Sequence, residues 1–477
     1  MTMRSNHSGE SSSREGRDSD RDAGSERRVA IHTLGCRLNM AESEMMRRQM
    51  AGEGFQLAGE AETADVVIVN TCTVTAAADG KSRQAIRGAR RKHPGATLAV
   101  TGCFAQLHPE EAARDCGADL VVGNGEKMAL PGHALALLEG TTSSDAPKFV
   151  MPRMERKPFA VGGFDPGTLV LSDGDTRAHL KIQDGCDFMC AFCLIPSARG
   201  RARARSLDNL LAEGEALLQA GVREIVLTGV NVGTYRQEEH GLLTVVDRLA
   251  ALNSESGQSL SRLRIGSIEP TTVPEGLLER MADSAHPLVP FLHLPLQSGS
   301  ARVLAAMGRR YGPGDYRAFA EQALARVPDL CLGADVLVGH PGEDDEAFAE
   351  TVEFTAGLPF AYLHVFPFSS RPGTAAHRME NTVPDGIIRR RAATMRTLGE
   401  NHREAFHRRF LGRTLPVLFE RPRDDGTAQG YTANYIRVGV PGNPAEDWRN
   451  RTLPVRLLES GGGRMAGVLE AVVEGRN

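Results

Sequence analysis

The stretch Cys186-Asp-Phe-Met-Cys190-Ala-Phe-Cys193 gathers three cysteines into one short segment with the spacing C-x3-C-x2-C. Three thiolates are one fewer than the four that normally close a cubane iron–sulfur cluster, so one iron would stay open to a substrate or cofactor. A tetrahedral zinc site needs a fourth cysteine or histidine close by, and the nearest candidate, His179, lies upstream on an expected strand. The spacing therefore favours an iron–sulfur cluster, and a chance group of buried or zinc-binding cysteines is the alternative.

The composition is typical of a globular protein in a reducing compartment. The 477 residues correspond to about three domains, and 41% of them are apolar. No apolar run reaches the ~18–20 residues of a membrane helix. Residues 1–28 lack the hydrophobic stretch of a secretory signal, so we expect a disordered tail. Eight cysteines over this length do not resemble a secreted disulfide framework, which favours a cytoplasmic protein. With a net charge of −4, contact with nucleic acid would have to come from local basic patches.

Three more cysteines each follow a short apolar run near the start of the chain. The runs are residues 29–35, 66–71 and 98–102, followed by Cys36, Cys72 and Cys103. Their length and β-branched content predict buried strands, alternating with helices at 41–52, 76–92 and 109–115. This alternation predicts a parallel sheet, in which the carboxyl ends of the strands share one edge. We therefore expect these cysteines to converge; the alternative is that they only fill a core, as we expect of Cys116 and Cys331.

A longer α/β array follows a connector rich in Gly, Pro, Ser and Thr at residues 141–171. Its predicted strands are residues 178–183, 224–228, 262–268, 291–296, 332–338 and 362–366, with helical stretches between them. Six β/α units predict an open partial barrel, with function at the carboxyl ends of the strands. The residues that fall there are Cys186, Asn231, Glu269, Gln297 and His340.

The end of the chain changes character. After a basic helix beyond Pro384, short apolar runs at residues 415–420, 431–438, 453–458 and 467–473 are separated by Gly, Pro, Asn and Asp. This pattern predicts a small all-β module.

These segments together resemble the methylthiotransferase family of radical S-adenosylmethionine (SAM) enzymes. In the first part the resemblance rests on Thr33-Leu-Gly-Cys-Arg-Leu-Asn39, Asn70-Thr-Cys-Thr-Val-Thr75 and Val100-Thr-Gly-Cys-Phe-Ala-Gln106. It continues through residues 183–196, whose cysteine spacing and aromatic before the last cysteine are the radical SAM signature. Residues 227–233, 293–299 and 370–374 extend it, so that it covers about residues 29–473.

The resemblance implies a three-part α/β protein. Its parts would be an N-terminal parallel α/β domain (29–140), a partial (β/α)6 radical SAM core (172–402) and a small all-β TRAM module that binds RNA (403–477). One 4Fe-4S cluster would be held by Cys186, Cys190 and Cys193, and a second by Cys36, Cys72 and Cys103. The first would bind SAM and the second would carry sulfur.

The resemblance also suggests how SAM is bound. Phe192 is expected near the SAM adenine or as a wall of the cluster pocket. Gly229, Asn231 and Glu269 are candidate SAM contacts, although Glu269 could equally be a solvated strand end. No acid–base residue is expected to remove hydrogen from carbon 2 of an adenine, so the cofactor must supply that chemistry.

Within the family, the motifs around Cys36 and residues 430–437 resemble most the enzymes that act on threonylcarbamoyladenosine in tRNA. The alternatives are isopentenyladenosine in tRNA, an aspartate of a ribosomal protein and, outside the family, a non-catalytic RNA-binding protein with structural zinc. The implied partners are tRNA, two SAM molecules, an electron donor such as a flavodoxin or ferredoxin, and a sulfur source, with no membrane. Two residues depart from the family pattern, Ser197 and His340, and we expect His340 to be a packing residue.

Two basic runs are candidate RNA contacts. They are Arg199, Arg201, Arg203 and Arg205 beside the cysteine motif, and Lys81, Arg83, Arg87, Arg90, Arg91 and Lys92 on a predicted helix. Such residues could bind phosphates or be ordinary solvated faces. Tyr431 and Tyr435 could stack on bases or belong to a core. Arg371 could contact an anionic group or lie on the surface.

Overall fold

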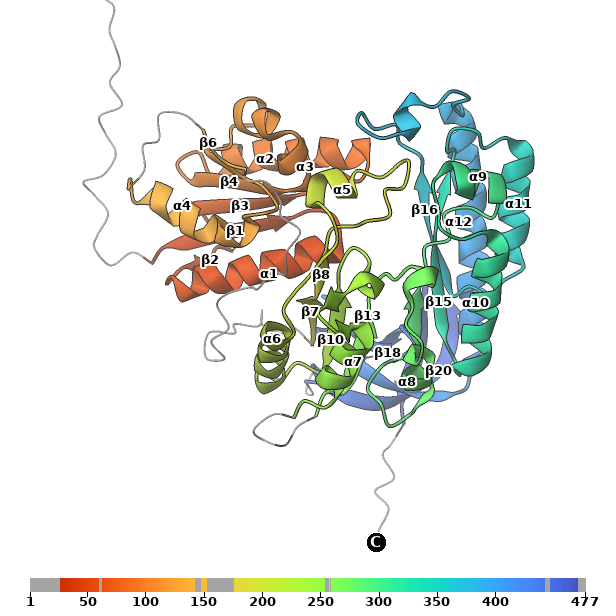
Figure 1. Cartoon of the computed structure of the whole chain (residues 1–477). Coiled ribbons are helices and arrows are strands. Elements are labelled where there is room, and N and C mark those ends of the chain that lie inside the picture. The colour runs from red at the N-terminus through yellow and green to blue at the C-terminus, as the bar shows by residue number, and fades with distance from the viewer. Residues whose placement is uncertain are drawn as a thin grey trace, which may run out of the picture.

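The computed structural model describes residues 26–59, 62–141, 147–151, 176–253, 257, 259–441 and 447–470. The expected tail and most of the expected connector lie outside these residues. Figure 1 shows three successive parts: an N-terminal α/β unit, a central unit of strands and helices, and a C-terminal barrel. Among the described helices, none combines the length and the apolar character that crossing a membrane requires.

A six-stranded parallel sheet in the order β2-β1-β3-β4-β5-β6 forms the N-terminal unit. Its strands are β1 (Arg28–Thr33), β2 (Gln56–Leu57), β3 (Val66–Thr71), β4 (Thr97–Gly102), β5 (Leu120–Val122) and β6 (Lys148–Val150). Its helices are α1 (Arg37–Gly52), α2 (Ala76–Lys92), α3 (Cys103–Leu107) and α4 (Leu130–Leu138), with a π-helical turn at Glu111–Asp115. Apolar clusters around Ile86 and around Met46 cover its two faces. The predicted parallel α/β arrangement is therefore confirmed.

The strands that the sequence missed lie at the edges of this sheet or, for β5, next to an edge. Strand β2 has only two residues, and β5 and β6 have three each, so their periodicity is too short to detect. Strand β6 falls inside the expected connector, where it pairs with β5. Cys116 is buried in the core of this unit, as expected.

The central unit has six parallel strands, in two sheets of order β13-β10-β7 and β14-β15-β16. The strands are β7 (Arg177–Lys181), β10 (Glu224–Thr228), β13 (Arg262–Ile265), β14 (Phe291–His293), β15 (Cys331–Val338) and β16 (Tyr362–Pro367). The bridges Leu263–Leu288 and Ser267–His293 connect the two sheets. These are the six predicted strands, shifted by at most a few residues. Two short antiparallel strand pairs are additional, β8 (Gln183–Asp184) with β9 (Arg203–Ala204) and β11 (Arg236–Gln237) with β12 (His240–Gly241).

Helices cover the outside of these strands (Figure 1). They are α6 (Leu207–Gln219), α7 (Leu242–Ala250), α8 (Leu277–Ala282), α9 (Ala301–Ala306), α10 (Pro313–Arg326), α11 (Asp345–Ala356) and α12 (Asp385–Arg408). The short helix α5 (Ile195–Arg199) lies instead beside α3 of the N-terminal unit. Because side chains alternate along a strand, Ile225 and Leu227 pack beneath the helices. His179, Val226 and Arg264 line a cavity on the inner face.

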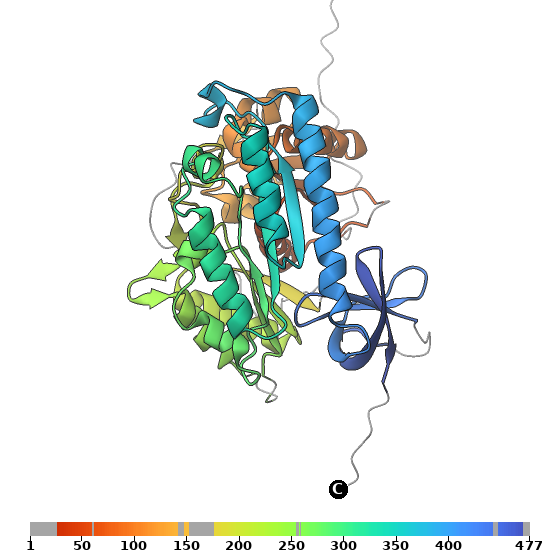
Figure 2. The same cartoon turned by 90° about the vertical axis from the view of Figure 1, so that its right-hand side faces the viewer.

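The C-terminal unit is a closed five-stranded barrel in the order β17-β18-β19-β21-β20. Its strands are β17 (Thr414–Phe419), β18 (Ala428–Thr432), β19 (Arg437–Val440), β20 (Thr452–Gly461) and β21 (Arg464–Leu469). Helix α12 leads into it, so the expected boundary at residue 402 falls within a continuous helix (Figure 2). The predicted strand 431–438 is in fact two strands, because Tyr435 turns the chain with φ 66°.

Backbone carbonyls of the C-terminal barrel dock on arginines of the central unit. Arg262 donates hydrogen bonds to the carbonyl oxygens of Tyr431 at 2.7 Å and Pro416 at 2.9 Å. Arg264 donates one to Ala433 at 3.2 Å. The barrel is thereby held at the amino ends of β13 and its neighbours.

A buried ionic cluster holds the N-terminal unit against the central unit. Glu42 of α1 accepts Lys127 Nζ at 2.6 Å within its own unit. Across the interface it accepts Lys181 Nζ at 2.6 Å and Arg199 Nη1 at 2.9 Å. Arg199 also binds Asp184 at 3.0 Å, and each of these side chains is at most 6% exposed. Burial alone would raise the pKa of both carboxyl groups, but the surrounding cations outweigh it and hold the pKa of Glu42 and Asp184 below the ordinary range.

Gly102 provides the turn that places Cys103. Its φ is +99°, and a Cβ there would lie 2.3 Å from the carbonyl oxygen of Thr71. We therefore expect Gly102→Ala to lower the free energy of unfolding by at least about 1–3 kcal/mol, measured by urea denaturation. Gly88→Ala is the matched control, because Gly88 lies inside α2 with no atom within 4 Å of the added Cβ. It should be neutral or stabilise by up to ~1 kcal/mol, and equal effects of both substitutions would contradict this account of Gly102.

The ionic cluster predicts sensitivity to acid. A carboxyl whose pKa is depressed by folding stabilises the folded state above its unfolded pKa, about 4, and loses that contribution as pH falls toward the folded pKa. The free energy of unfolding should therefore decline from about pH 5 downward. Arg199→Met should lower it by about 3–5 kcal/mol at pH 7 and flatten the acid dependence, since it leaves two buried carboxylates short of a partner.

The control for Arg199→Met is its neighbour Arg201, whose side chain is 50% exposed and 3.8 Å from Asp187. Arg201→Met should change stability by no more than about 0.5 kcal/mol. An Arg199→Met profile parallel to that of the wild type would show that the cluster does not couple to acid.

Candidate functional site: two cysteine triads at one interface

The cysteines at 186, 190 and 193 lie in a loop directly after β8. Gly185 starts the loop with φ +73°, and a Cβ there would lie 2.1 Å from the carbonyl oxygen of Arg201. Each of the three sulfurs has an N–H donor directed at it. The donors are the Phe188 amide to Cys186 at 3.5 Å, the Ile195 amide to Cys193 at 3.4 Å and the Arg309 guanidinium to Cys190 at 3.3 Å. Such donors suit thiolate ligands, which carry negative charge.

Cys36, Cys72 and Cys103 come together as predicted, because β1, β3 and β4 are neighbours in the sheet. Cys36 precedes α1, Cys72 follows β3, and Cys103 begins α3 after β4. The approach is close, since a Cβ on Gly35 would lie 2.8 Å from Cys72 Sγ. Burial raises the pKa of the Cys72 thiol to about 11, and its nearness to Cys103 and Cys36 adds to the shift.

The two triads meet at the interface between the N-terminal and central units. Helix α3, which starts at Cys103, packs on α5, which follows Cys193 (Figure 1). The Asn124 side-chain amide connects them, with Nδ2 3.9 Å from Cys103 Sγ and 2.7 Å from the carbonyl oxygen of Ala198. Arg371 closes the same interface, because it is buried and binds Asp79 at 2.6 Å and Thr73 at 2.8 Å, directly after Cys72. The interpretation of Arg371 as a surface residue was therefore wrong, whereas a contact with a substrate anion stays a prediction.

The thiols are too widely spaced for one metal ion. In the part of the chain that the structure describes, His293, Asp335 and His364 form the one group of three possible ligands whose atoms all lie within 4.8 Å of each other. A zinc ion with sulfurs at 2.3 Å would bring three thiolates within that distance. Both triads therefore fit a larger polynuclear cluster better than a single zinc ion.

The candidate SAM residues lie next to the radical SAM motif. Gln183 Oε1 accepts the amide of Asn231 at 3.1 Å, and a Cβ on Gly229 would lie 2.8 Å from the same oxygen. Asn231 Oδ1 accepts the amide of Glu269 at 3.3 Å, while its Nδ2 is buried without a hydrogen-bond partner. Glu269 is not a solvated residue at a strand end, because it forms an ion pair with Arg309. Burial raises the pKa of the Glu269 carboxyl group.

Phe192 is half-buried and packs on the central core. Its ring is 6.2 Å from the ring of His340. His340 is fully buried, with Nδ1 3.0 Å from the carbonyl oxygen of Pro341, so it is a packing residue as expected.

Two groups were missed by sequence reasoning. Arg309 connects Cys190 to Glu269, but an isolated arginine more than a hundred residues from the motif carries no signal. His293, Asp335 and His364 form a row across β14, β15 and β16, with His293 Nε2 3.0 Å and His364 Nδ1 3.3 Å from Asp335 Oδ1. Only pairing of distant strands brings them together.

Half of the basic residues considered as RNA contacts are buried or half-buried, and the other half are exposed. Arg199 and Arg205 are fully buried, and Arg205 pairs with Glu213, so neither can reach a phosphate. On α2, Arg83 pairs with Glu111 and Arg90 with Asp119. The exposed members are Arg201, Lys81, Arg87, Arg91 and Lys92.

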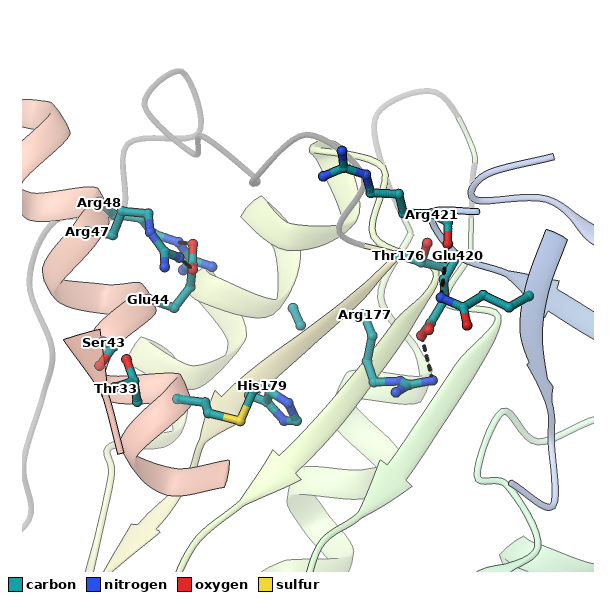
Figure 3. Close-up of a pocket in the computed structure, with 13 residues that line it drawn as sticks. Thr33, Ser43, Glu44, Arg47, Arg48, Thr176, Arg177, His179, Glu420 and Arg421 are labelled. Atoms are coloured by element: carbon teal, nitrogen blue, oxygen red, sulfur yellow. Dashed lines mark hydrogen bonds and ion pairs between the residues drawn. The ribbon is translucent and has the colours of Figure 1, made fainter. Parts of the chain in front are cut away.

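Two adjoining cavities lie where α1, β7 and the C-terminal barrel meet. The large cavity, about 460 Å³, is lined by Arg47 and Arg48 of α1 and by Glu420 and Arg421 after β17 (Figure 3). The small cavity, about 230 Å³, is lined by Arg37, Met40, Arg177, His179, Val226, Arg264 and Tyr435. Tyr431 stacks on Tyr435 with ring centroids 4.9 Å apart, so both tyrosines are half-buried between the barrel and the central unit.

Comparison with known proteins agrees with this geometry. Residues 28–123 match the uncharacterized protein family UPF0004, and residues 180–355 match the radical SAM superfamily. The threonylcarbamoyladenosine tRNA methylthiotransferase MtaB of Bacillus subtilis is 34% identical over 94% of this chain and 97% of its own length. MtaB of Aquifex aeolicus is also 34% identical, over 82% of this chain and 92% of its own length.

The fold has a counterpart among solved structures. The radical SAM methyltransferase TsrM from Kitasatospora setae superposes with a TM-score of 0.54 at 18% identity, covering 74% of this chain and 77% of that one. Membership of the radical SAM superfamily implies SAM and a 4Fe-4S cluster as cofactors. On the strength of its relatives and its domain matches, the chain belongs to the family of radical SAM methylthiotransferases that includes MtaB.

Proposed function

We propose that this protein converts N6-threonylcarbamoyladenosine, next to the anticodon of tRNA, to its 2-methylthio derivative in the cytoplasm. The observation that carries the proposal is the meeting of two cysteine triads at one interface, in a chain related over most of its length to enzymes named for this substrate. One triad alone would serve radical chemistry without a place for the inserted sulfur.

Two 4Fe-4S clusters and two SAM molecules are proposed as the cofactors. Cys186, Cys190 and Cys193 would hold one cluster, and Cys36, Cys72 and Cys103 the other. When bound, the first supplies the electron that cleaves SAM reductively, and the second supplies the sulfur that is methylated and inserted. The N–H donors directed at the three sulfurs of the first triad, and the polynuclear spacing of both, support this assignment.

The surrounding residues would bind and orient SAM. Asn231, with its buried unpartnered Nδ2, is proposed to donate a hydrogen bond to SAM. Gly229 would act indirectly, because the absence of a side chain there lets Gln183 pack against the turn that carries Asn231. Glu269 would accept hydrogen bonds from the ribose hydroxyl groups of SAM, while its ion pair with Arg309 holds the carboxylate in position. Phe192 would pack against the adenine.

The remaining partners follow from the reaction. The C-terminal barrel is proposed to be a TRAM module that binds tRNA, assisted by exposed cations of α2. An electron donor such as a flavodoxin or ferredoxin would reduce the first cluster, and a separate sulfur source would replenish the second.

The direct test is product analysis. The anaerobically reconstituted protein should convert threonylcarbamoyladenosine in tRNA to its 2-methylthio derivative, detected by mass spectrometry of the digested nucleosides. Product from isopentenyladenosine instead would move the protein to a different branch of the family, and a colourless zinc-containing protein would refute the proposal altogether.

The triads should be separable by mutation. Cys72→Ala removes a ligand of the second triad only, so it should still release 5′-deoxyadenosine from SAM yet form no methylthio product. Cys186→Ala should abolish both. Cys116→Ala is the matched control, since Cys116 is buried in the N-terminal core away from both triads, and it should retain both activities. If Cys72→Ala still formed methylthiolated tRNA, the triad of Cys36, Cys72 and Cys103 would not be required for the reaction.

Arg309 should tune the first cluster. Its positive charge and N–H donor beside Cys190 stabilise added negative charge, so Arg309→Gln should lower the midpoint potential by on the order of 60 mV, the equivalent of a tenfold change for one electron. The measurement is a redox titration followed by electron paramagnetic resonance. Arg310→Gln is the control, because Arg310 lies over the ring of Phe188 and donates to the carbonyl oxygen of Asp187, with no hydrogen bond to a cysteine sulfur among the described residues. An equal shift in both variants would argue against a specific role for Arg309.

A further inference from the structure

The small cavity is strongly cationic for its size. Arg37, Arg177 and Arg264 line it, and Arg262 lies beside them. Glu224 is shared among three of these guanidinium groups, at 2.7 Å from Arg264, 3.0 Å from Arg177 and 4.0 Å from Arg262. Glu420 adds a second carboxylate, which binds Arg177 at 3.0 Å. Four arginines therefore face two carboxylates.

Two of these arginines retain unused capacity to bind an anion. Arg264 is 1% exposed, yet its Nη1 has no hydrogen-bond partner. Arg37 forms no ion pair with any residue in the described ranges, and its guanidinium lies 5.8 Å from the ring of Tyr435. Leaving a buried donor unpaired is costly, so this arrangement favours a bound acceptor.

His179 lines the same cavity beside these arginines. Burial lowers the pKa of His179 to about 4, and Arg37 and Arg177 contribute to the shift. Because four arginines face only two carboxylates around this cavity, a further cation is disfavoured there, whereas an anion would be stabilised. An apolar substituent would displace water from the guanidinium groups without accepting a hydrogen bond from them, so binding it there would be unfavourable.

The small cavity lies next to the second cysteine triad, where carbon 2 of the substrate adenine would have to react. Arg37 is the residue directly after Cys36, a member of the second triad. In adenine, carbon 2 and the nitrogen at position 6 lie on the same edge of the ring. If the base presents carbon 2 to the triad of Cys36, Cys72 and Cys103, its N6 substituent lies toward residues that neighbour this triad, such as Arg37.

We infer that Arg37 and Arg264 bind the carboxylate of the threonylcarbamoyl group and thereby select the acidic N6 substituent over an apolar one. This inference rests on the proposed function and adds a specificity-determining site to it. A planar guanidinium matches a carboxylate with two parallel hydrogen bonds, and the ring of Tyr435 completes the wall of the cavity.

The test compares three anticodon stem–loop RNAs that differ only at the modified base: threonylcarbamoyladenosine, its neutral carboxamide analogue, and unmodified adenosine. Binding to the holoenzyme is followed anaerobically by fluorescence anisotropy. The wild type should bind the carboxylate RNA about tenfold more tightly than the carboxamide RNA, equivalent to about 1.4 kcal/mol. Equal binding of these two RNAs by the wild type would overturn the inference without any mutant.

Arg37→Gln should remove the preference by weakening only the carboxylate RNA. Its unchanged affinity for the carboxamide and unmodified RNAs would show that the variant is folded, and Arg37→Lys should keep part of the preference. Arg421→Gln is the matched control, since Arg421 lines the large cavity and should not distinguish the RNAs. An Arg37→Gln variant with the full preference, or an Arg421→Gln variant without it, would refute the assignment.

Different results would refute the proposed function and the proposed carboxylate-binding site. If the wild type forms no methylthio product from threonylcarbamoyladenosine, the proposed function is wrong. If it forms that product but does not distinguish carboxylate from carboxamide, the function stands and the binding site for the carboxylate is refuted.

Discussion

The buried ionic cluster of Glu42, Lys127, Lys181, Asp184 and Arg199 is the constraint on which the arrangement of the site depends. Charged groups removed from water are stable only with close partners, and the ion pairs here are made across two separately built sheets. Few relative positions of the sheets satisfy them all. An apolar interface would tolerate sliding, whereas this one defines how α3 and α5, and hence the two cysteine triads, face each other.

The same cluster shapes the electrostatics of the site. Lys181 and Arg203 add to the positive charge around Asp184. The charge of Arg199 also lowers the pKa of Cys72 and so opposes part of the increase caused by burial. Thiolate ligands and the clusters they bind carry negative charge, which nearby cations stabilise. The interface that holds the two domains together would thus also stabilise the anionic clusters proposed above, and the proposed binding of a substrate carboxylate by Arg37 and Arg264 would depend on the same attraction between opposite charges.

Parallel strand order explains why much of this site was predictable. In both the N-terminal and central units, chemically important residues follow strands, and parallel strands bring their carboxyl ends to one edge. The convergence of Cys36, Cys72 and Cys103 therefore followed from three apolar runs, each ending in a cysteine. Strands β3, β4 and β10 are buried along their whole length and consist largely of apolar residues, whereas β2, β5 and β6 were too short to show any period.

The sequence by itself determined the cysteine motifs, the order of the three parts and the family, because these depend on local spacing and on runs of apolar residues. Only the tertiary structure decided the fate of the charged residues. Arg199, Arg205 and Arg371 read as surface cations but are buried in ion pairs, while Arg37 and Arg264 acquired a shared cavity from three different parts of the chain. The reason is physical: the burial and partners of a long charged side chain depend on which distant surfaces meet around it, and no local pattern of residues encodes that.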